Sequence, residues 1–425
     1  MLEIQVLRNK SEEVIKGLEK RHVKDARATV KEILQLDEKR RTTIQEADQA
    51  KQQMNQYAKS IGMLMKQGKK EEAEEAKAQT SRLKTSIKEF DENLKEIDGG
   101  MRELLVTLPN VPHESVPVGK DASDNVEVFK NDLEVSFGFK ALPHWELATN
   151  HKLIDWGLGA KITGSGFPVY MGKGARLQRA LISFFLDQGV EAGYTEIQPP
   201  LMVNEDSAFA TGQLPDKEGQ MYHATADNFY LIPTAEVPIT NIYRDVILAE
   251  NELPVKNCGY TPCFRREAGS YGKDVKGLNR LHQFDKVELV QIAHPDKSYE
   301  VLEEMTNHVA GLLEALKLPY RKLILCTGDA TFTSAKTYDM EVFSAGQERW
   351  LEVSSISNFE TYQTNRLKLR FRNADKKTQL AHSLNGSALA LPRILAAILE
   401  NNQQEDGSIA VPEVLRPYTQ FDTIG

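Results

Sequence analysis

The stretch CFRREAGSYG at residues 263–272 concentrates charge and small residues in one place. Two adjacent arginines and a glutamate follow an apolar approach, and several small residues come directly after them. Arginine suits bidentate binding of phosphate because its planar guanidinium presents paired N–H donors. The stretch therefore predicts a binding site for an anionic, phosphate-bearing ligand.

A second strand, RLHQFDKVELVQI, is predicted to pair with the first one as a hairpin. The loop between them is rich in glycine and basic residues, namely Gly269, Gly272, Lys273, Lys276, Gly277 and Arg280. Strand alternation gathers on one face Arg265, Glu267, Phe284 and Glu288. These offer a phosphate ligand, a ring that can stack on a base, and carboxylates for an amine or a metal. A surface hairpin with ordinary cross-strand ion pairs is the alternative.

The segment WLEVSSISNFE is predicted to be a strand that carries Glu352, followed by Ser354 and Ser355. Beside a triphosphate, Glu352 would suit Mg²⁺, which prefers one or two carboxylates together with phosphate oxygens. The pattern GxxxxGK[ST] does not occur in the chain, so ATP would bind without a Walker loop.

Two further segments place charges in apolar surroundings. LIPTAEVP ends a strand with Thr234 and Glu236, and a glutamate in such a setting needs a partner, for which a substrate ammonium would serve. In LNGSALALPRILAAILEN, Pro392 suits a first helical turn and puts Arg393 where a helix begins. That arrangement favours a bound anion at the helix start; a solvated arginine is the alternative.

The first hundred residues differ from the segments above, because their pattern predicts an antiparallel coiled-coil hairpin. Apolar or small residues recur in alternate steps of three and four, which is an a/d heptad seam. Its positions are Val30, Ile33, Ile44, Ala47, Met54, Ala58 and Ile61, then Ala73, Ala76, Thr80, Leu83, Ile87, Phe90, Leu94, Ile97, Met101 and Leu104. Gly62 and Gly68 bracket the expected break, so the two helices fold back on each other.

This arm lacks the apolar surface of a globular core, so it is expected to project on the order of 50 Å into solvent. Lys66, Lys69 and Lys70 at its tip are candidates for phosphate contact. A spacer or a dimerisation rod is the alternative, since many coiled coils are structural.

Prolines end the arm at TLPNVPHESVPVG, because proline cannot continue a helix. The sequence predicts an arm domain at 1–110, a linker at 111–130 and a second domain at 131–425. In the second domain, residues 175–203 predict an apolar helix and then an edge strand that runs into prolines. A bare edge invites pairing with another subunit.

The composition is that of an ordinary soluble protein, with 40% hydrophobic and 27% charged residues and a formal net charge of −8. That charge excludes a surface coated with phosphate-binding groups, so any nucleic-acid contact must be local. The N-terminus lacks the pattern of a secretory signal, and no apolar run is long enough for a membrane span, so we expect a cytoplasmic protein. Three cysteines without CxxC spacing predict reduced thiols.

The helix–strand with its prolines, the FRxE hairpin with its basic loop, and the strand–helix arginine resemble motifs 1, 2 and 3 of class II aminoacyl-tRNA synthetases. With the coiled-coil arm, TAE at 234–236, FRREAGSYGKDVKGLNRLHQF and LEVSS, the chain resembles the bacterial-type seryl-tRNA synthetases over essentially its whole length. The resemblance implies an α+β fold, with a class II catalytic domain on an antiparallel sheet and an N-terminal helical arm. It also implies a homodimer, in which the arm reaches across to tRNA bound by the partner.

The implied reaction has two steps. Serine and Mg·ATP give seryl-adenylate and pyrophosphate, and the seryl group then passes to the 3′-terminal ribose of tRNA(Ser), with tRNA(Sec) as a further acceptor. The implied catalytic residues are Arg265, Arg393 and Glu352. The implied ATP site comprises Arg265, Arg266, Glu267, Arg280, Phe284, Glu352, Val353, Ser354, Ser355 and Arg393. The implied serine site comprises Thr234, Ala235, Glu236, Arg265, Glu288, Asn385 and Ser387.

The same resemblance suggests individual roles. Arg265 is expected on the α-phosphate, Arg393 on the γ-phosphate, Phe284 against the adenine and Glu288 on the serine ammonium. Mg²⁺ would be held with ATP by Glu352 and Ser355, no zinc is expected, and Lys66, Lys69 and Lys70 would contact tRNA. The run from Gly386 to Arg393 departs from the general motif 3 pattern of two glycines and a glutamate.

Three other functions compete with this interpretation. A coiled-coil interaction protein with a synthetase-like but inactive domain would be expected to have lost Arg265, Glu288 or Arg393, and all three are present. A ligase for carrier proteins would be expected to lack the arm. A class II enzyme for threonine or proline would need a different pocket.

Overall fold

The computed structural model describes residues 1–268 and 276–425. Gly269, Gly272 and Lys273 of the predicted basic loop lie outside the described residues. The chain divides into two compact units, Leu2–Pro109 and Asn110–Gly425, with Met1 counted in the second.

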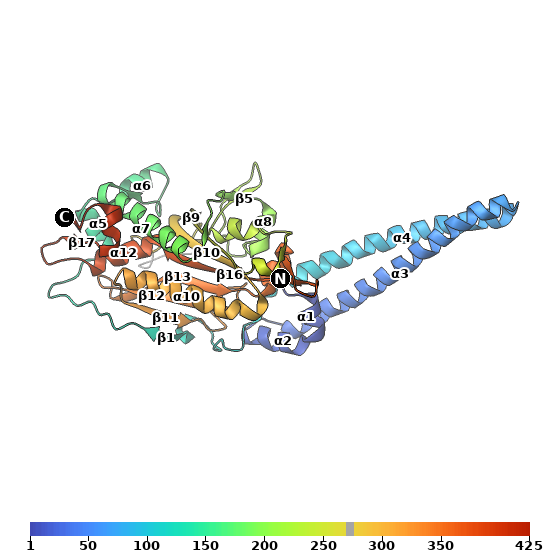
Figure 1. The fold of residues 1–425 in the computed structure, drawn as a ribbon, viewed down its shortest axis with the longest axis horizontal. Coiled ribbons are helices and arrows are strands. Elements are labelled where there is room, and N and C mark those ends of the chain that lie inside the picture. The colour runs from blue at the N-terminus through green and yellow to red at the C-terminus, as the bar shows by residue number, and fades with distance from the viewer. Residues whose placement is uncertain (269–275) are drawn as a thin grey trace. The chain divides into compact units, whose positions relative to one another are not determined.

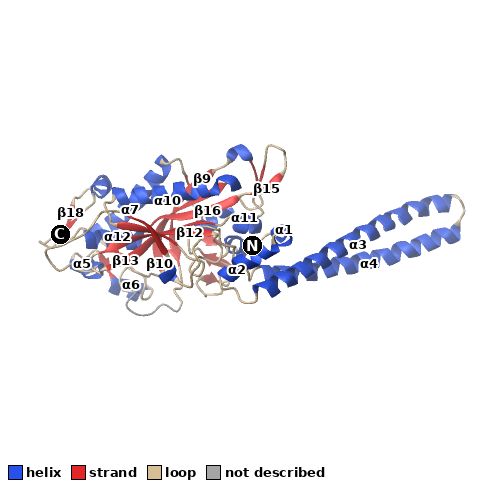
Figure 2. Ribbon diagram, turned by 90° about the horizontal axis from the view of Figure 1, so that it is seen from below, coloured by secondary structure: helices blue, strands red, loops and turns tan. Residues whose placement is uncertain are grey.

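The first unit is helical. It begins with α1 (Ile4–Asn9) and α2 (Ser11–Lys20), and continues with the long helices α3 (Ala26–Lys66) and α4 (Lys70–Leu105). These two run antiparallel along each other, as Figures 1 and 2 show. The antiparallel pair of long helices predicted from the heptads is therefore present.

The turn of the arm is shorter than expected. Gly62 does not interrupt α3, which continues to Lys66, and nothing lies within 4 Å of the position that a Cβ at Gly62 would take. Gly68 has a φ of 75°, a left-handed conformation that glycine adopts without steric cost. The reversal therefore depends on one glycine, and Gly62 is tolerated as an exposed helical residue.

The heptad seam lies between the two helices as predicted. All ten seam positions from Ala73 to Leu104 are buried or half-buried, and so are those in α3 except Ala58, which is exposed. One buried charge interrupts the seam. Asp37 is 1% exposed and accepts from the guanidinium of Arg8, whose Nη2 lies 2.6 Å from Oδ1. A more exposed pair, Arg40 and Asp98, connects α3 to α4 at 2.6 Å.

The second unit is built on an eight-stranded sheet within the described residues. Its strand order is β1 (Val126–Lys130), β11 (Tyr320–Ile324), β12 (Lys336–Ser344), β13 (Arg349–Asn358), β16 (His382–Ala390), β10 (Gln283–Ala293), β9 (Val255–Phe264) and β4 (Thr195–Glu196). All neighbouring pairs are antiparallel except β4 with β9. The α+β class and the antiparallel sheet predicted from the sequence are confirmed.

Helices α7 (Gly172–Glu191), α10 (Ser298–Ala315) and α12 (Leu391–Asn401) pack against this sheet and form the main core with it. The apolar face predicted for α7 is buried, with Leu177 and Phe185 at 0% exposure. Strand β4 follows α7 at the sheet edge, as expected for the proline-terminated strand.

The remaining elements are short. The helices are α5 (His144–Asn150), α6 (Trp156–Ile162), α8 (Glu205–Thr211), α9 (Glu236–Asn241), α11 (Thr361–Leu367) and α13 (Arg416–Thr419). The small sheets are β5 (Met202–Val203), β7 (Phe229–Leu231), β6 (His223–Ala224); β15 (Thr378–Leu380), β14 (Arg370–Arg372), β8 (Ile247–Ala249); β2 (Ile154–Asp155), β3 (Val169–Tyr170); and β17 (Ile409–Ala410), β18 (Thr423–Ile424).

The segment 111–130, expected to be a linker, contributes to the sheet. It contains a 3-10 turn at Ala122–Asp124 and strand β1, which pairs with β11. Cys258, Cys263 and Cys326 are all buried free thiols, as the cysteine spacing predicted. Among the described helices, none combines the length and the apolar content needed to cross a membrane.

Candidate active site

One face of the sheet gathers the predicted polar residues, and strand alternation explains why. On β10, Val287 and Leu289 enter the core with the helices, so Lys286 and Glu288 point to the opposite face. Across the ladder, Glu288 lies opposite Ser387 of β16 and opposite Gly259 of β9. A polar floor is thus built from neighbouring strands in fixed register.

Glu288 is the centre of this floor and has no exposed surface. Its carboxylate accepts from the hydroxyl of Thr234 at 3.0 Å and from the amide of Asn385 at 2.7 Å. The ammonium of Lys286 forms an ion pair with it and also donates to the hydroxyl of Thr234 at 2.9 Å. Thr234, Glu288 and Asn385, which come from three distant segments, therefore meet at one buried carboxylate.

A second carboxylate, Glu236, lies at the start of α9 and is 7% exposed. Gln363 of α11 donates to it at 2.6 Å. Burial raises the pKa of Glu236 to about 7, and the charge of Glu288 adds to this shift, while the bond from Gln363 opposes it. The pocket thus holds one carboxylate in a firm ion pair and another whose ionisation is costly without a cation.

Arg265 follows β9 and reaches over the neighbouring strand. Its guanidinium carbon lies 5.1 Å from the centroid of the Phe284 ring, and its Nε donates to the main-chain oxygen of Pro233 at 3.4 Å. Strand β9 ends at Phe264, so residues 265–267 form a loop and not the continued strand that was expected. Glu267 has a φ of 48° and pairs with Arg280 at 2.9 Å.

A β-bulge brings Glu352 and Ser355 together. Three residues apart, they would point to opposite faces of a regular strand. In the ladder of β12 and β13, Glu341 pairs with Glu352 but Met340 pairs with Ser354, so β13 has one extra residue at that point. Such a bulge re-aims the side chains around it.

Asp339 of β12 interacts with both of these residues. It lies opposite Ser355, which hydrogen-bonds to it. Burial raises the pKa of Asp339 well above its usual range, the charge of Glu352 raises it further, and the bond from Ser355 opposes the shift. Its Oδ1 is buried and has no hydrogen-bond partner among the described residues. A further buried carboxyl group therefore lies beside Glu352 and Ser355, on the neighbouring strand.

Arg393 is the third residue of α12, which has Pro392 in its first turn as predicted. Its Nη1 donates to the main-chain oxygen of Glu352 at 2.6 Å and lies 3.6 Å from the Glu352 carboxylate. Its Nε donates to the main-chain oxygen of Asn279 at 3.2 Å, one residue before Arg280. The segments of motifs 2 and 3 thus converge beside Glu352.

Several predicted residues lie apart from these polar contacts. Arg266 is exposed, and Ala235 and Val353 are buried in apolar clusters. Ser354 donates to the main-chain oxygen of Ser387 at 2.6 Å and so joins two strands. Lys66, Lys69 and Lys70 are exposed at the turn of the arm.

The sequence reasoning missed three residues of this site. Lys286 lies two residues before Glu288 on the same strand, and this spacing was the available signal. Asp339 and Gln363 gave no signal, because their roles depend on strand pairing and on helix packing.

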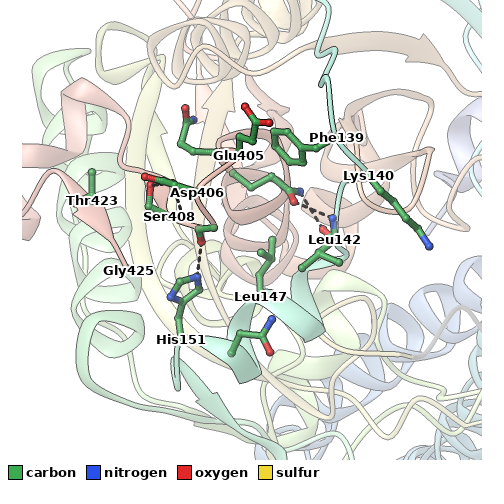
Figure 3. A pocket seen from close by; sticks show the side chains of 14 residues that line it. Phe139, Lys140, Leu142, Leu147, His151, Glu405, Asp406, Ser408, Thr423 and Gly425 are labelled. Carbon is green, nitrogen blue, oxygen red and sulfur yellow. Dashed lines mark hydrogen bonds between the residues drawn. The ribbon is translucent and has the colours of Figure 1, made fainter.

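A separate hollow of about 770 Å³ lies elsewhere in the second unit (Figure 3). It is lined by Lys140, His151, Asp406 and Ser408, among others, and shares no residue with the predicted site. In it His151 contacts the main-chain oxygen of Gly407 at 2.9 Å.

Comparisons with known proteins point the same way as this geometry. Residues 1–112 match the model of the seryl-tRNA synthetase N-terminal domain, and residues 221–402 match the tRNA synthetase class II core domain (G, H, P, S and T). The chain is 53% identical over 427 residues to the serine--tRNA ligase of Salinibacter ruber, covering 100% of this chain and 99% of that protein.

Solved structures agree. The seryl-tRNA synthetase of Pyrococcus horikoshii, crystallised with ATP, superposes with a TM-score of 0.92 at 36% identity and covers 100% of this chain and 99% of its own. The cytoplasmic serine-tRNA ligase of Naegleria fowleri, in complex with AMP, gives 0.87 at 27% identity, with 100% and 98% covered.

Proposed function

The chain belongs to the seryl-tRNA synthetase family, which joins serine to tRNA(Ser) with ATP, and on that premise we propose that the site above performs both steps. The protein is a class II aminoacyl-tRNA synthetase: it activates serine as seryl-adenylate and transfers the seryl group to tRNA. The proposal concerns which residues do this and how.

The observation that carries the proposal is the buried carboxylate of Glu288. Glu288 has no exposed surface. Its carboxylate accepts hydrogen bonds from the hydroxyl of Thr234 and the amide of Asn385, and it forms an ion pair with the ammonium of Lys286. A second ammonium, that of serine, finds here a charged acceptor in a water-poor setting. Glu236, whose pKa is raised by burial, is then the neighbouring group that a small polar side chain can satisfy.

Adenylate formation requires attack by the serine carboxylate on the α-phosphate, and no side-chain nucleophile takes part. We assign Arg265 to hold that carboxylate and phosphate together, because it stands between the serine pocket and the ring of Phe284. Phe284 offers its face to the adenine. Arg280 and Arg393 neutralise the distal phosphates as negative charge shifts toward the leaving pyrophosphate.

The residues around Glu352 fit a magnesium ion that enters with ATP. Within the described ranges no three His, Cys, Asp or Glu side chains form a ready-made metal cage, but Mg²⁺ bound with a nucleotide needs only one or two carboxylates. Glu352 and Ser355 would hold it, and the unpartnered Oδ1 of Asp339 lies nearby, on a carboxyl group whose ionisation a bound cation would favour. When bound, the ion would neutralise phosphate charge in the transition state.

The arm is assigned to tRNA. Residues 1–110 form the proposed tRNA-binding domain, with Lys66, Lys69 and Lys70 as phosphate contacts, and the activating domain lies in 131–425. We propose a homodimer, because the short edge strand β4 is exposed and is followed by the exposed apolar residues Leu201 and Met202. Since tRNA charging supplies the ribosome, the cytoplasm is the proposed location.

The experiment that tests this proposal is amino-acid-dependent exchange of pyrophosphate into ATP, measured with each amino acid, together with charging of tRNA. We expect exchange with serine, and charging of tRNA(Ser). Exchange that is faster with threonine or alanine would contradict the assignment of the pocket. The same charging assay with tRNA(Sec) tests the second acceptor.

A further inference from the structure

The residues that precede Arg280 are held by a buried polar network that touches none of the predicted serine residues. His144, the first residue of α5, has no exposed surface. The main-chain N–H of Leu278 donates to its Nε2 at 2.8 Å, and its Nδ1 lies 2.7 Å from Oε1 of Glu400 in α12. One imidazole therefore connects the loop that leads into β10 with the helix that begins near Arg393.

These partners fix the tautomer of His144. A main-chain N–H can only donate, so Nε2 is the nitrogen without hydrogen. Nδ1 then carries the hydrogen and donates it to the carboxylate of Glu400. Burial raises the pKa of Glu400, but the hydrogen bonds from His144 and Ser344 outweigh burial and leave that pKa below its usual value. The ring is thus neutral, and both of its nitrogens are engaged.

A second branch leads from Glu400 to the next residue of the loop. Gln347 donates to Oε1 of Glu400 at 3.0 Å, and its own oxygen accepts from the side-chain amide of Asn279 at 2.9 Å. The other carboxylate oxygen of Glu400 accepts from the hydroxyl of Ser344 and from the N–H of Gly346 at 3.0 Å. Glu400 therefore reaches Leu278 through His144 and reaches Asn279 through Gln347.

Helix α12 holds this segment at two points. Arg393 donates to the main-chain oxygen of Asn279 at 3.2 Å, and Glu400 lies seven residues further on, which is two turns along the same side of the helix. Side chains on that side can therefore act on adjacent residues of one loop.

The loop is shaped to fit α5. A Cβ on Gly277 would lie 2.2 Å from Nε2 of His144, so a larger residue would displace the ring or the loop. Gly277 also has a φ of 67°, which glycine alone adopts without strain. Beside it, the ammonium of Lys276 lies 4.5 Å from the centroid of the Trp145 ring.

We propose that His144 and Glu400 are positioning residues for ATP: they hold residues 277–280 in place, so that Arg280 and Arg393 can contact the phosphates of one ATP molecule together. The proposal rests on the phosphate-binding role given above to these two arginines. Neither His144 nor Glu400 contacts the serine cluster, so their effect is specific to ATP. A displacement of about 1 Å at a catalytic group can cost on the order of 10²-fold in rate.

The test compares two substitutions of the same residue in the full-length protein. In His144→Gln the amide oxygen takes the place of Nε2 and still accepts from Leu278. In His144→Asn the amide nitrogen takes the place of Nδ1 and still donates to Glu400, but nothing reaches Leu278. Hydrogen–deuterium exchange of peptides that cover residues 276–282 and the KM values for ATP and for serine are measured for both.

We expect His144→Asn to speed amide exchange in that peptide and to raise the KM for ATP about tenfold, with the KM for serine unchanged. Tenfold corresponds to about 1.4 kcal/mol, which is within the range for one lost hydrogen bond. His144→Gln should stay within about threefold of the parent protein in both measurements. Equal effects of the two substitutions, or a parallel rise in the KM for serine, would show that His144 only stabilises the fold and would overturn the proposal.

Gly277→Ala disturbs the same contact from the loop side while His144 and Glu400 themselves are unchanged in sequence. It should reproduce the rise in the KM for ATP even if the His144 variants fold poorly. An unchanged KM for ATP in Gly277→Ala would contradict the proposal. Because amide exchange requires no catalysis, it tests the anchoring of Leu278 separately from the proposed roles of Arg280 and Arg393.

Discussion

Lys286 and Glu288 form an ion pair two residues apart on the same strand, and both side chains are almost completely buried. A buried pair of this kind costs desolvation energy, which only further hydrogen bonds recover. Thr234 and Asn385 supply these bonds to Glu288. The pair therefore holds the carboxylate of Glu288 in a fixed set of contacts inside the pocket.

Replacing that carboxylate should weaken serine binding selectively. In Glu288→Gln the ammonium of Lys286 loses its counter-ion and the serine ammonium loses its acceptor, so we expect kcat/KM for serine to fall roughly 10²-fold, which corresponds to about 3 kcal/mol. The KM for ATP should change little. Pyrophosphate exchange at varied serine and varied ATP measures both. A matched control is Glu341→Gln, which changes a glutamate on β12. A similar loss in both variants would contradict the assignment of Glu288.

The ring of Phe284 gives a prediction for the nucleotide. Stacking of a base on an aromatic ring contributes about 1–3 kcal/mol, so Phe284→Leu should raise the KM for ATP roughly tenfold. It also removes the face on which the Arg265 guanidinium rests. Phe284→Tyr keeps the ring and should bind ATP almost normally. If leucine and tyrosine gave the same KM for ATP, adenine stacking on this residue would be wrong.

Glu236 predicts a pH dependence of stability. Its pKa in the folded protein is about 7, against 4.5 as the ordinary value, so the folded state binds the proton more tightly than the unfolded chain does. The resulting stabilisation is fully present below about pH 4.5 and is lost as the pH rises through 7. Relative to Glu236→Gln, the parent protein should lose about 3 kcal/mol of stability over that range.

The measurement is the thermal denaturation midpoint of both proteins at several pH values between 5 and 8. The midpoint of the parent protein should fall relative to that of Glu236→Gln as the pH rises. A gap between the two proteins that stays constant with pH would mean that Glu236 does not titrate in this range.

Much of the fold was predictable from the sequence because its signals are local. The heptad seam and Gly68 specify a helical hairpin, and the alternation on β10 puts Lys286 and Glu288 on one face. The break expected at Gly62 was wrong because a glycine exposed in a long helix costs only about 1 kcal/mol, which neighbouring turns absorb.

The parts of the site that could not be predicted depend on strand pairing. Glu352 and Ser355 lie on one side only because β13 has an extra residue against β12, and a bulge is not visible in the letters of a single strand. Asp339 lies beside them because the same pairing of β12 with β13 puts it opposite Ser355. His144 and Glu400 are 256 residues apart, so only the packing of α5 on α12 reveals their contact.

The buried carboxylate of the arm predicts a local weakness. Asp37 is 1% exposed and its pKa is lowered because Arg8 hydrogen-bonds to it, although burial opposes the shift. Asp37→Asn should destabilise the arm by about 2 kcal/mol, because it removes the charged acceptor of the Arg8 guanidinium. Asp98→Asn, which breaks the more exposed pair with Arg40, should cost under about 1 kcal/mol. Urea denaturation followed by helical circular dichroism measures both, and equal losses would contradict the difference in burial.

Replacing the lysines at the turn of the arm should affect the transfer to tRNA and not the activation of serine. Replacing Lys66, Lys69 and Lys70 with serine removes positive charge from an exposed tip, where Lys69 also pairs with Glu72 at 2.9 Å. Charging of tRNA(Ser) should weaken. Its dependence on salt should also become less steep, because binding through fewer phosphate contacts releases fewer counter-ions from the tRNA. Serine-dependent pyrophosphate exchange needs no tRNA and should be unchanged. The control replaces Lys16, Lys20 and Lys31, which are also exposed but lie in α2 and near the start of α3. If the control lowered charging as much as the tip variant does, overall charge and not a contact at the tip would be responsible.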